Sequence, residues 1–127
     1  MAELDYAFLA EFAQIIDGKL TAVNASFIDV KTTVPALFQL AVAGRVSAPA
    51  DVDQVRLAVK LASPDKTTTF TWNADLSTKG LPVYDDKVGI LFAVRLGLPI
   101  NTHGLFTVTI DIDEQEARRL AFEAVAP

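Results

Sequence analysis

Cysteine is absent from this 127-residue sequence, and histidine occurs once, at position 103. The absence of cysteine excludes disulfides, thiolate metal sites and cysteine nucleophiles. A catalytic triad or a metal site with histidine would depend on His103 alone, which we expect to be an exposed loop residue. No serine has the Gly-x-Ser-x-Gly surroundings of a nucleophile elbow. These absences favour a non-enzymatic protein without a cofactor or a metal site.

Basic residues and long apolar runs are also scarce. Lysine and arginine number 11 against 16 acidic residues, which gives a net charge of −5, and the only adjacent basic pair is Arg118-Arg119. An acidic chain without a basic stripe is a poor partner for nucleic acid or an anionic membrane. No stretch approaches the roughly 20 apolar residues of a membrane span, and the first residues lack the features of a signal peptide. We therefore expect a cytoplasmic protein, or a virion protein if a phage encodes it.

The clearest pattern in the chain is a strict alternation of apolar and polar residues between Gly104 and Asp113. Its two sets are Phe106, Val108, Ile110 and Ile112, and Thr107, Thr109, Asp111 and Asp113. Side chains alternate across a strand with period two, so this stretch is a half-buried antiparallel strand.

Two hairpins follow from turn residues. Asp17-Gly18 is the favoured pair for a type I′ turn, and it would align Ile15 with Leu20, Phe12 with Val23, and Phe8 with Phe27. A four-residue turn at 63–66 would pair Val59 with Phe70 and Leu57 with Trp72. These registers place apolar residues opposite one another, as cross-strand stabilisation requires.

Two more strands are expected, at 37–46 with Gly44 as a possible bulge and at 88–96, and residues 73–86 are expected to form the longest loop. Residues 114–125 fit either a helix capped by Asp113 or a strand. We favour the strand, with an odd-length turn at 114–116 that pairs Ile110 with Leu120 and Val108 with Phe122.

About eight strands, with turns near every 8–12 residues, predict a single-domain, all-β, immunoglobulin-like antiparallel sandwich over residues 1–127. Its predicted core consists of Phe8, Leu57, Val59, Phe92, Val94, Phe106, Val108 and Ile110. Residues 5–12, 17–23 and 103–112 also resemble a family of small uncharacterised bacterial proteins. That resemblance implies the sandwich fold and no activity.

Three acidic clusters and three aromatic residues are the remaining candidates for a ligand site. The clusters are Asp51/Asp53, Asp85/Asp86 and Asp111/Asp113/Glu114/Glu116; calcium needs six to eight converging oxygens, and we expect solvated turns instead. Tyr6, Trp72 and Tyr84 would be needed for a sugar platform, but Trp72 is expected in the core. Calcium or carbohydrate binding by loops is therefore an alternative function.

Apolar residues occur on both faces of two predicted strands. Leu9 and Ile15 alternate with the inward set of the first strand, and Leu91 does so in the strand at 88–96. A strand that is apolar on both faces is expected where both faces are covered. We expect a homo-oligomer or a larger protein assembly, with Leu9, Ile15, Leu91 and the loop residue Tyr84 at the interface. The predicted function is an assembly module that self-associates, or a structural subunit of a larger particle such as a phage capsid decoration or tail component.

Overall fold

The computed structural model describes all 127 residues and contains eleven strands and no helix. The strands are β1 (Glu3–Ala10), β2 (Phe12–Ile16), β3 (Lys19–Val23), β4 (Asp29–Lys31), β5 (Ala36–Pro49), β6 (Gln54–Ala62), β7 (Thr69–Ser77), β8 (Val83–Tyr84), β9 (Lys87–Ile100), β10 (Gly104–Ile112) and β11 (Gln115–Val125). No helix of sufficient length and hydropathy to cross a membrane is present.

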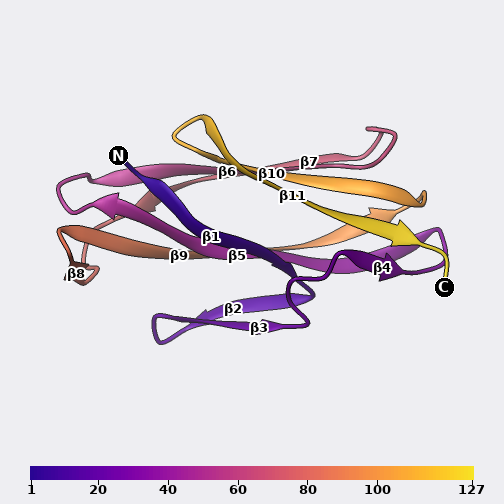
Figure 1. Cartoon of the computed structure of the whole chain (residues 1–127), viewed down its shortest axis with the longest axis horizontal. Coiled ribbons are helices and arrows are strands. Elements are labelled where there is room, and N and C mark those ends of the chain that lie inside the picture. The colour runs from indigo at the N-terminus through magenta and orange to yellow at the C-terminus, as the bar shows by residue number, and fades with distance from the viewer.

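The strands form two main sheets and one hairpin (Figure 1). The smaller sheet has the order β1-β5-β9-β8, the larger one β4-β11-β10-β6-β7, and β2-β3 forms a separate two-stranded sheet. In chain order these correspond to the ABED and GFCC′ sheets of an immunoglobulin-type sandwich. β4 pairs in parallel with β11, so the N-terminal part of the chain contributes an edge to both sheets. The predicted fold class is confirmed.

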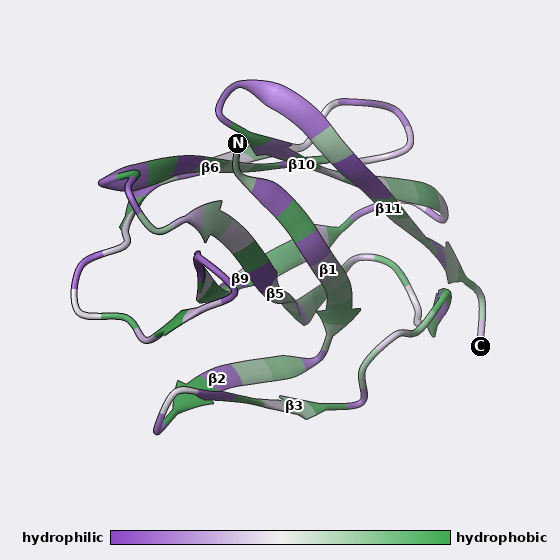
Figure 2. Ribbon diagram, turned by 60° about the vertical axis from the view of Figure 1, so that its left-hand side comes forward, coloured by the Kyte–Doolittle hydropathy of each residue, from purple (hydrophilic) through white to green (hydrophobic).

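The core lies between the two main sheets. It contains residues of β5 and β9 on one side and of β6, β10 and β11 on the other. Seven of the eight predicted core residues are buried, and Phe106 stacks on Phe122 with ring centroids 5.1 Å apart. Phe8 is the exception and is only half-buried. The alternation of hydropathy along the strands is visible in Figure 2.

The C-terminal segment is a strand, as predicted, but its register differs. The turn has two residues, Asp113 and Glu114, both with positive φ. A bulge at Ala117 follows, and beyond it Val108 lies opposite Leu120. The bulge adds the one residue that an odd-length turn would have added. The apolar residues of β11 therefore still face those of β10.

The β6-β7 hairpin is also shifted by two residues from the predicted register. Val59 pairs with Trp72 rather than Phe70, because the loop spans six residues from Ser63 to Thr68. In this loop the Asp65 carboxylate accepts hydrogen bonds from Ser63 Oγ at 2.8 Å and from the hydroxyl and backbone N–H of Thr67. These bonds lower the pKa of Asp65. They also stabilise a six-residue loop, which is two residues longer than the turn predicted at 63–66.

The predicted long loop at 73–86 is mostly structured. β7 continues to Ser77, and β8 pairs with the start of β9 across a turn at Asp85-Asp86. β9 runs on to Ile100, four residues beyond the predicted end at 96, and the extension includes Gly97 and Pro99. Both lie within its pairing with β5.

The N-terminal segment divides into β1 and the β2-β3 hairpin, as the chain leaves the smaller sheet at Glu11. The predicted turn is present: Asp17 and Gly18 have φ of 50° and 70°, and Ile15 pairs with Leu20 and Phe12 with Val23. Phe8 does not pair with Phe27.

A bulge in β1 explains the position of Phe8. Leu4 lies opposite Val46 and Tyr6 opposite Arg45, so Asp5 is an extra residue. One extra residue exchanges the two faces of the strand from that point on. Leu9 therefore faces the core, while Phe8 lies on the outer face.

The bulge was predicted on the other strand, at Gly44. That glycine pairs regularly with Phe92, and its lack of a side chain allows the backbone of β1 to approach closely. A Cβ at this position would overlap the Tyr6 carbonyl oxygen and lie 2.9 Å from the Phe92 ring.

The β2-β3 hairpin covers part of the outer face of the smaller sheet (Figures 1 and 2). Ala13 of the hairpin packs with Ala10, Ala41 and Ala43, and Leu20 joins this cluster. The hairpin is a third layer that covers much of the second apolar face noted in the sequence.

Candidate functional site

The hairpin leaves parts of the outer face uncovered, and one of them carries two tyrosines and an arginine. Cross-strand pairing aligns Tyr6 of β1, Arg45 of β5 and Leu91 of β9 in one row. Tyr84 of β8 lies beside this row, next to Gly89. We name these four side chains, Tyr6, Arg45, Tyr84 and Leu91, the tyrosine–arginine face.

Arg45 is the centre of this face. Its Nε donates to Asp5 Oδ2 at 2.7 Å, and its guanidinium lies 5.2 Å from the centroid of the Tyr6 ring. The hydrogen bond to Asp5 raises the pKa of Arg45 above its ordinary value. The Arg45–Asp5 pair places no net charge at the centre of the face.

A glycine allows Arg45 and Tyr84 to approach each other. A Cβ at Gly89 would lie 3.3 Å from Arg45 Cδ and 3.7 Å from Tyr84 Cε1. The long side chains therefore converge over the bare backbone of β9. Tyrosine and arginine are enriched in the centres of protein interfaces because they combine large contact area with polar groups.

Two of the four predicted interface residues, Leu91 and Tyr84, belong to this face. Tyr84 is 47% exposed and Leu91 is half-buried. Ile15 is 42% exposed and lies near the tip of the hairpin. The prediction for Leu9 is wrong: it is 4% exposed and belongs to the core, because the bulge at Asp5 turns it inward.

Sequence reasoning did not place Tyr6 and Arg45 at an interface. Phe8, two residues after Tyr6 and on the same face of β1, was predicted to point inward, and that prediction would have placed Tyr6 inside as well. The available signal was Arg45, the only charged residue of β5. A charged side chain at this position requires that its face of the strand points outward.

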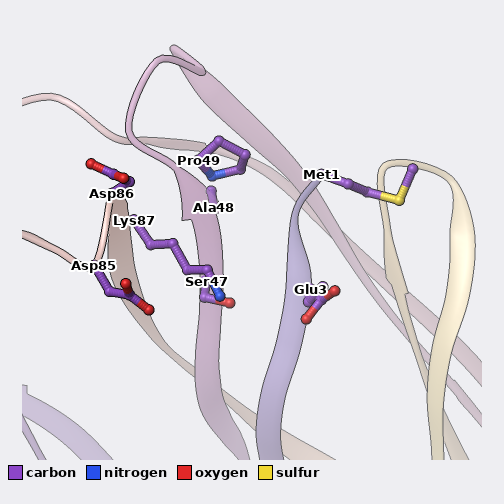
Figure 3. A pocket seen from close by; sticks show the side chains of 8 residues that line it. All are labelled: Met1, Glu3, Ser47, Ala48, Pro49, Asp85, Asp86 and Lys87. Atoms are coloured by element: carbon purple, nitrogen blue, oxygen red, sulfur yellow. The ribbon is translucent and has the colours of Figure 1, made fainter.

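A shallow pocket of about 190 Å³ lies next to this face, at the end of the smaller sheet that holds the N-terminus (Figure 3). Glu3 comes from β1, Ser47 from β5, and Asp85 and Asp86 from the turn before β9. Figure 3 shows the Lys87 side chain reaching across toward Ser47. Three carboxylates and one ammonium group give the pocket a negative rim.

The acidic clusters are engaged in structural contacts or lie in separate turns. Asp111 accepts from Lys60 Nζ at 2.8 Å, an interaction that raises the pKa of Lys60. Asp113 Oδ1 accepts from the Arg56 backbone N–H, and Glu116 pairs with Arg119. No group of three or more histidine or carboxylate side chains is close enough to hold a metal ion.

The three aromatic residues of the possible sugar platform are divided. Tyr6 and Tyr84 share the tyrosine–arginine face, but Arg45 covers one side of the Tyr6 ring. Trp72 lies in β7 and packs against the core, as predicted. His103 is exposed, as predicted, and its Nε2 lies 2.8 Å from the Thr32 carbonyl oxygen, a bond that ties the β9–β10 turn to the segment after β4.

Comparison with known proteins gives the family of the chain. No curated protein sequence matches it. A family model described as a family of unknown function (DUF6941) matches residues 5–125, which is nearly the whole chain and includes every segment on which the resemblance rested. The protein belongs to this family of unknown function.

Proposed function

We propose that the protein is a non-enzymatic assembly module that self-associates through the tyrosine–arginine face. The observation that supports this is the clustering of two tyrosines, an arginine and a leucine on a part of the sheet that the hairpin leaves open. Tyrosine and arginine are enriched among the residues that contribute most of the binding energy of interfaces.

The charge of the face favours a second copy as the partner. The whole chain has a net charge of −5, so two copies repel each other at long range. At the centre of the tyrosine–arginine face Arg45 and Asp5 neutralise each other, so the centre of a contact there brings no like charges together.

A charge introduced at the edge of this face tests the proposal. Tyr84→Lys combined with Leu91→Lys places two ammonium groups per copy in the contact, and neither side chain belongs to the buried core. We expect the dissociation constant of the self-complex to rise at least tenfold, about 1.4 kcal/mol. Light scattering coupled to size-exclusion chromatography, over a concentration series, measures this change.

The matched control is Ile28→Lys combined with Leu105→Lys. These apolar residues are 80% and 54% exposed, and both lie near Glu123 of β11 in the larger sheet, whereas the tyrosine–arginine face belongs to the smaller sheet. The control adds the same charge and should keep the parent's mass. A parent that is monomeric at every concentration, or a control that dissociates equally, contradicts the proposal.

The exposed side of the hairpin supports a second candidate function, that of a structural subunit in a larger particle such as a phage capsid or tail. Ile16 and Val23 are 46% and 49% exposed, and both lie on the hairpin face opposite to Ala13. This apolar surface is available for a neighbouring subunit. Neighbouring genes that encode virion proteins would favour this function over a cytoplasmic assembly; neighbours without any virion protein would count against it.

A further inference from the structure

β7 is a long and regular free edge of the larger sheet. It pairs with β6 over all nine of its residues without a register shift, and no strand lies on its other side. The other edges of the two main sheets are shorter or interrupted: β4 has three residues, β8 has two, and β1 has a bulge. Bulges, short length, proline and lysine protect edge strands from pairing with another chain. β7 has nine residues and no bulge, proline or lysine, and Asp75 is its only charged residue.

The apolar side of β7 is incompletely covered. Phe70, Trp72 and Leu76 pack against the core but are only half-buried. The larger sheet has five strands and the smaller sheet four, of which β8 has only two residues. The last strand of the larger sheet therefore extends beyond what the smaller sheet can cover.

We infer that β7 pairs antiparallel with β7 of a second copy of this chain. Two identical strands related by a two-fold axis pair antiparallel, and each free N–H and C=O along the edge then finds a partner. The two five-stranded sheets become one continuous ten-stranded sheet. Main-chain hydrogen bonds supply affinity in such strand addition, and the side chains set the register.

The sequence of β7 is self-complementary about its central residue. With the axis at Asn73, all nine residues are paired. Trp72 then faces Ala74 of the second copy and Phe70 faces Leu76, so that on the apolar side the largest residue lies opposite the smallest. On the polar side Asp75 faces Thr71, and no carboxylate opposes another. Like charges directly opposite each other would destabilise the pair.

Asp75 is also neutralised within its own copy. Arg56 Nε of β6 lies 3.1 Å from Asp75 Oδ1. The edge therefore presents no unpaired charge to the second copy.

Cysteine cross-linking tests the register directly, since the chain has no cysteine of its own. Asn73→Cys places two thiols opposite each other at the axis, where the Cα atoms are about 4.5–5.5 Å apart, within the range for a disulfide. Asn73 is exposed, so the parent fold tolerates the change. We expect Asn73→Cys to form a covalent dimer under mild oxidation.

Two further single variants serve as controls. Thr69→Cys and Ser77→Cys lie at the ends of β7 and do not oppose themselves in this register, so each alone stays monomeric on a denaturing gel. A mixture of the two gives a cross-linked heterodimer. If Asn73→Cys cross-links no faster than Thr69→Cys alone, the inference is wrong.

Charge variants test the same register without oxidation. Thr71→Lys places an ammonium group opposite Asp75 of the second copy, twice per dimer, and should strengthen the self-complex by about 2- to 30-fold. Thr71→Glu should weaken it by a similar factor. Thr21→Lys and Thr21→Glu add the same charges to β3, where Thr21 is exposed. At this position lysine should not strengthen the self-complex and glutamate should not weaken it. Equal responses at positions 71 and 21 would overturn the inference.

The inference shares with the proposed function only the premise that the partner is a second copy. Its residues belong to the other sheet. Loss of cross-linking at Asn73→Cys rejects β7 pairing and leaves the tyrosine–arginine face untouched, whereas an unchanged mass of the Tyr84→Lys, Leu91→Lys variant rejects the face and leaves β7 pairing untouched.

Discussion

At the scale of single residues, a few polar side chains fix the register of strands whose apolar pattern permits several. Asp65 is the clearest case. Its carboxylate accepts three hydrogen bonds from Ser63 and Thr67, and Ser63 Oγ in turn accepts from the Thr68 backbone N–H. This network makes the loop two residues longer than the turn signal of Pro64 implies, and so moves Trp72 opposite Val59.

The Asp65 network predicts a pH dependence of stability. The hydrogen bonds, first of all the one from Ser63, lower the pKa of Asp65 in the folded protein below its ordinary value. A carboxylate with a lowered folded pKa stabilises the fold above its unfolded pKa, and the contribution disappears as the pH falls through the folded pKa. The melting temperature of the parent should therefore exceed that of Asp65→Asn above about pH 4, and the two should converge at lower pH.

The comparison is made by thermal unfolding between pH 2 and pH 7. Asp51→Asn, in the exposed turn after β5, is the control and should follow the parent at every pH. A difference between the parent and Asp65→Asn that persists unchanged to pH 2 would show that the carboxylate charge is not the cause.

At the scale of elements, the β2-β3 hairpin is the feature that sets this sandwich apart from a two-layer one. It follows β1 without a long linker and folds back over β5 and β9, where the side chains beneath it are mostly alanine. Small side chains allow the hairpin to approach closely. A cation–π contact between Arg95 and the Phe12 ring, at 5.0 Å, holds its base.

The turn of the hairpin gives a prediction at this scale. Gly18 has a φ of 70°, and nothing lies within 4 Å of a Cβ built there, so a substitution acts only through the backbone. Gly18→Val should cost about 1–2 kcal/mol, the penalty for a left-handed conformation. Gly18→Asn should cost less, because asparagine tolerates this region.

Chemical denaturation measures both changes. Gly18→Val destabilises the hairpin that covers the alanine cluster. The backbone amides of β2 and β3 should therefore exchange their hydrogens faster than in the parent. Equal stability of the valine variant and the parent would mean that the turn has another geometry in solution.

At the scale of the whole molecule, the two proposed contacts lie on different sheets. The tyrosine–arginine face belongs to the smaller sheet and β7 to the edge of the larger one. A subunit with two separate two-fold contacts forms either a closed assembly with dihedral symmetry, of which the tetramer is the smallest, or an open chain, according to the relation between the two axes. The smaller sheet would contribute side-chain contacts and the larger sheet main-chain hydrogen bonds.

This arrangement predicts how the assembly responds to combined variants. The parent should form species larger than a dimer of the 13.7-kDa chain. Tyr84→Lys with Leu91→Lys, and separately Thr71→Glu with Asn73→Glu, should each stop at the dimer. All four substitutions together should give a folded monomer. Sedimentation velocity distinguishes these species, and a parent that stops at the dimer would mean that only one of the two contacts forms.

The sequence by itself determined the fold class, the buried faces of β6, β9 and β10, the type I′ turn at Asp17-Gly18 and the strand character of β11. Each of these depends on local periodicity or on the backbone preference of one or two residues. A period of two in Phe106, Val108 and Ile110 is sufficient to define a buried face, whatever packs on it.

The tertiary structure alone decided which face of β1 is buried, how β6 and β7 align, and what covers the second apolar face. The extra residue at Asp5 exchanges the faces of β1, so Leu9 enters the core and Tyr6 joins Arg45 outside. The local pattern does not show which face of β1 points inward, because both faces of this strand are apolar. The deciding contacts join residues far apart in the chain: β1 must pass over Gly44 of β5, and the hairpin must reach the alanines beneath it.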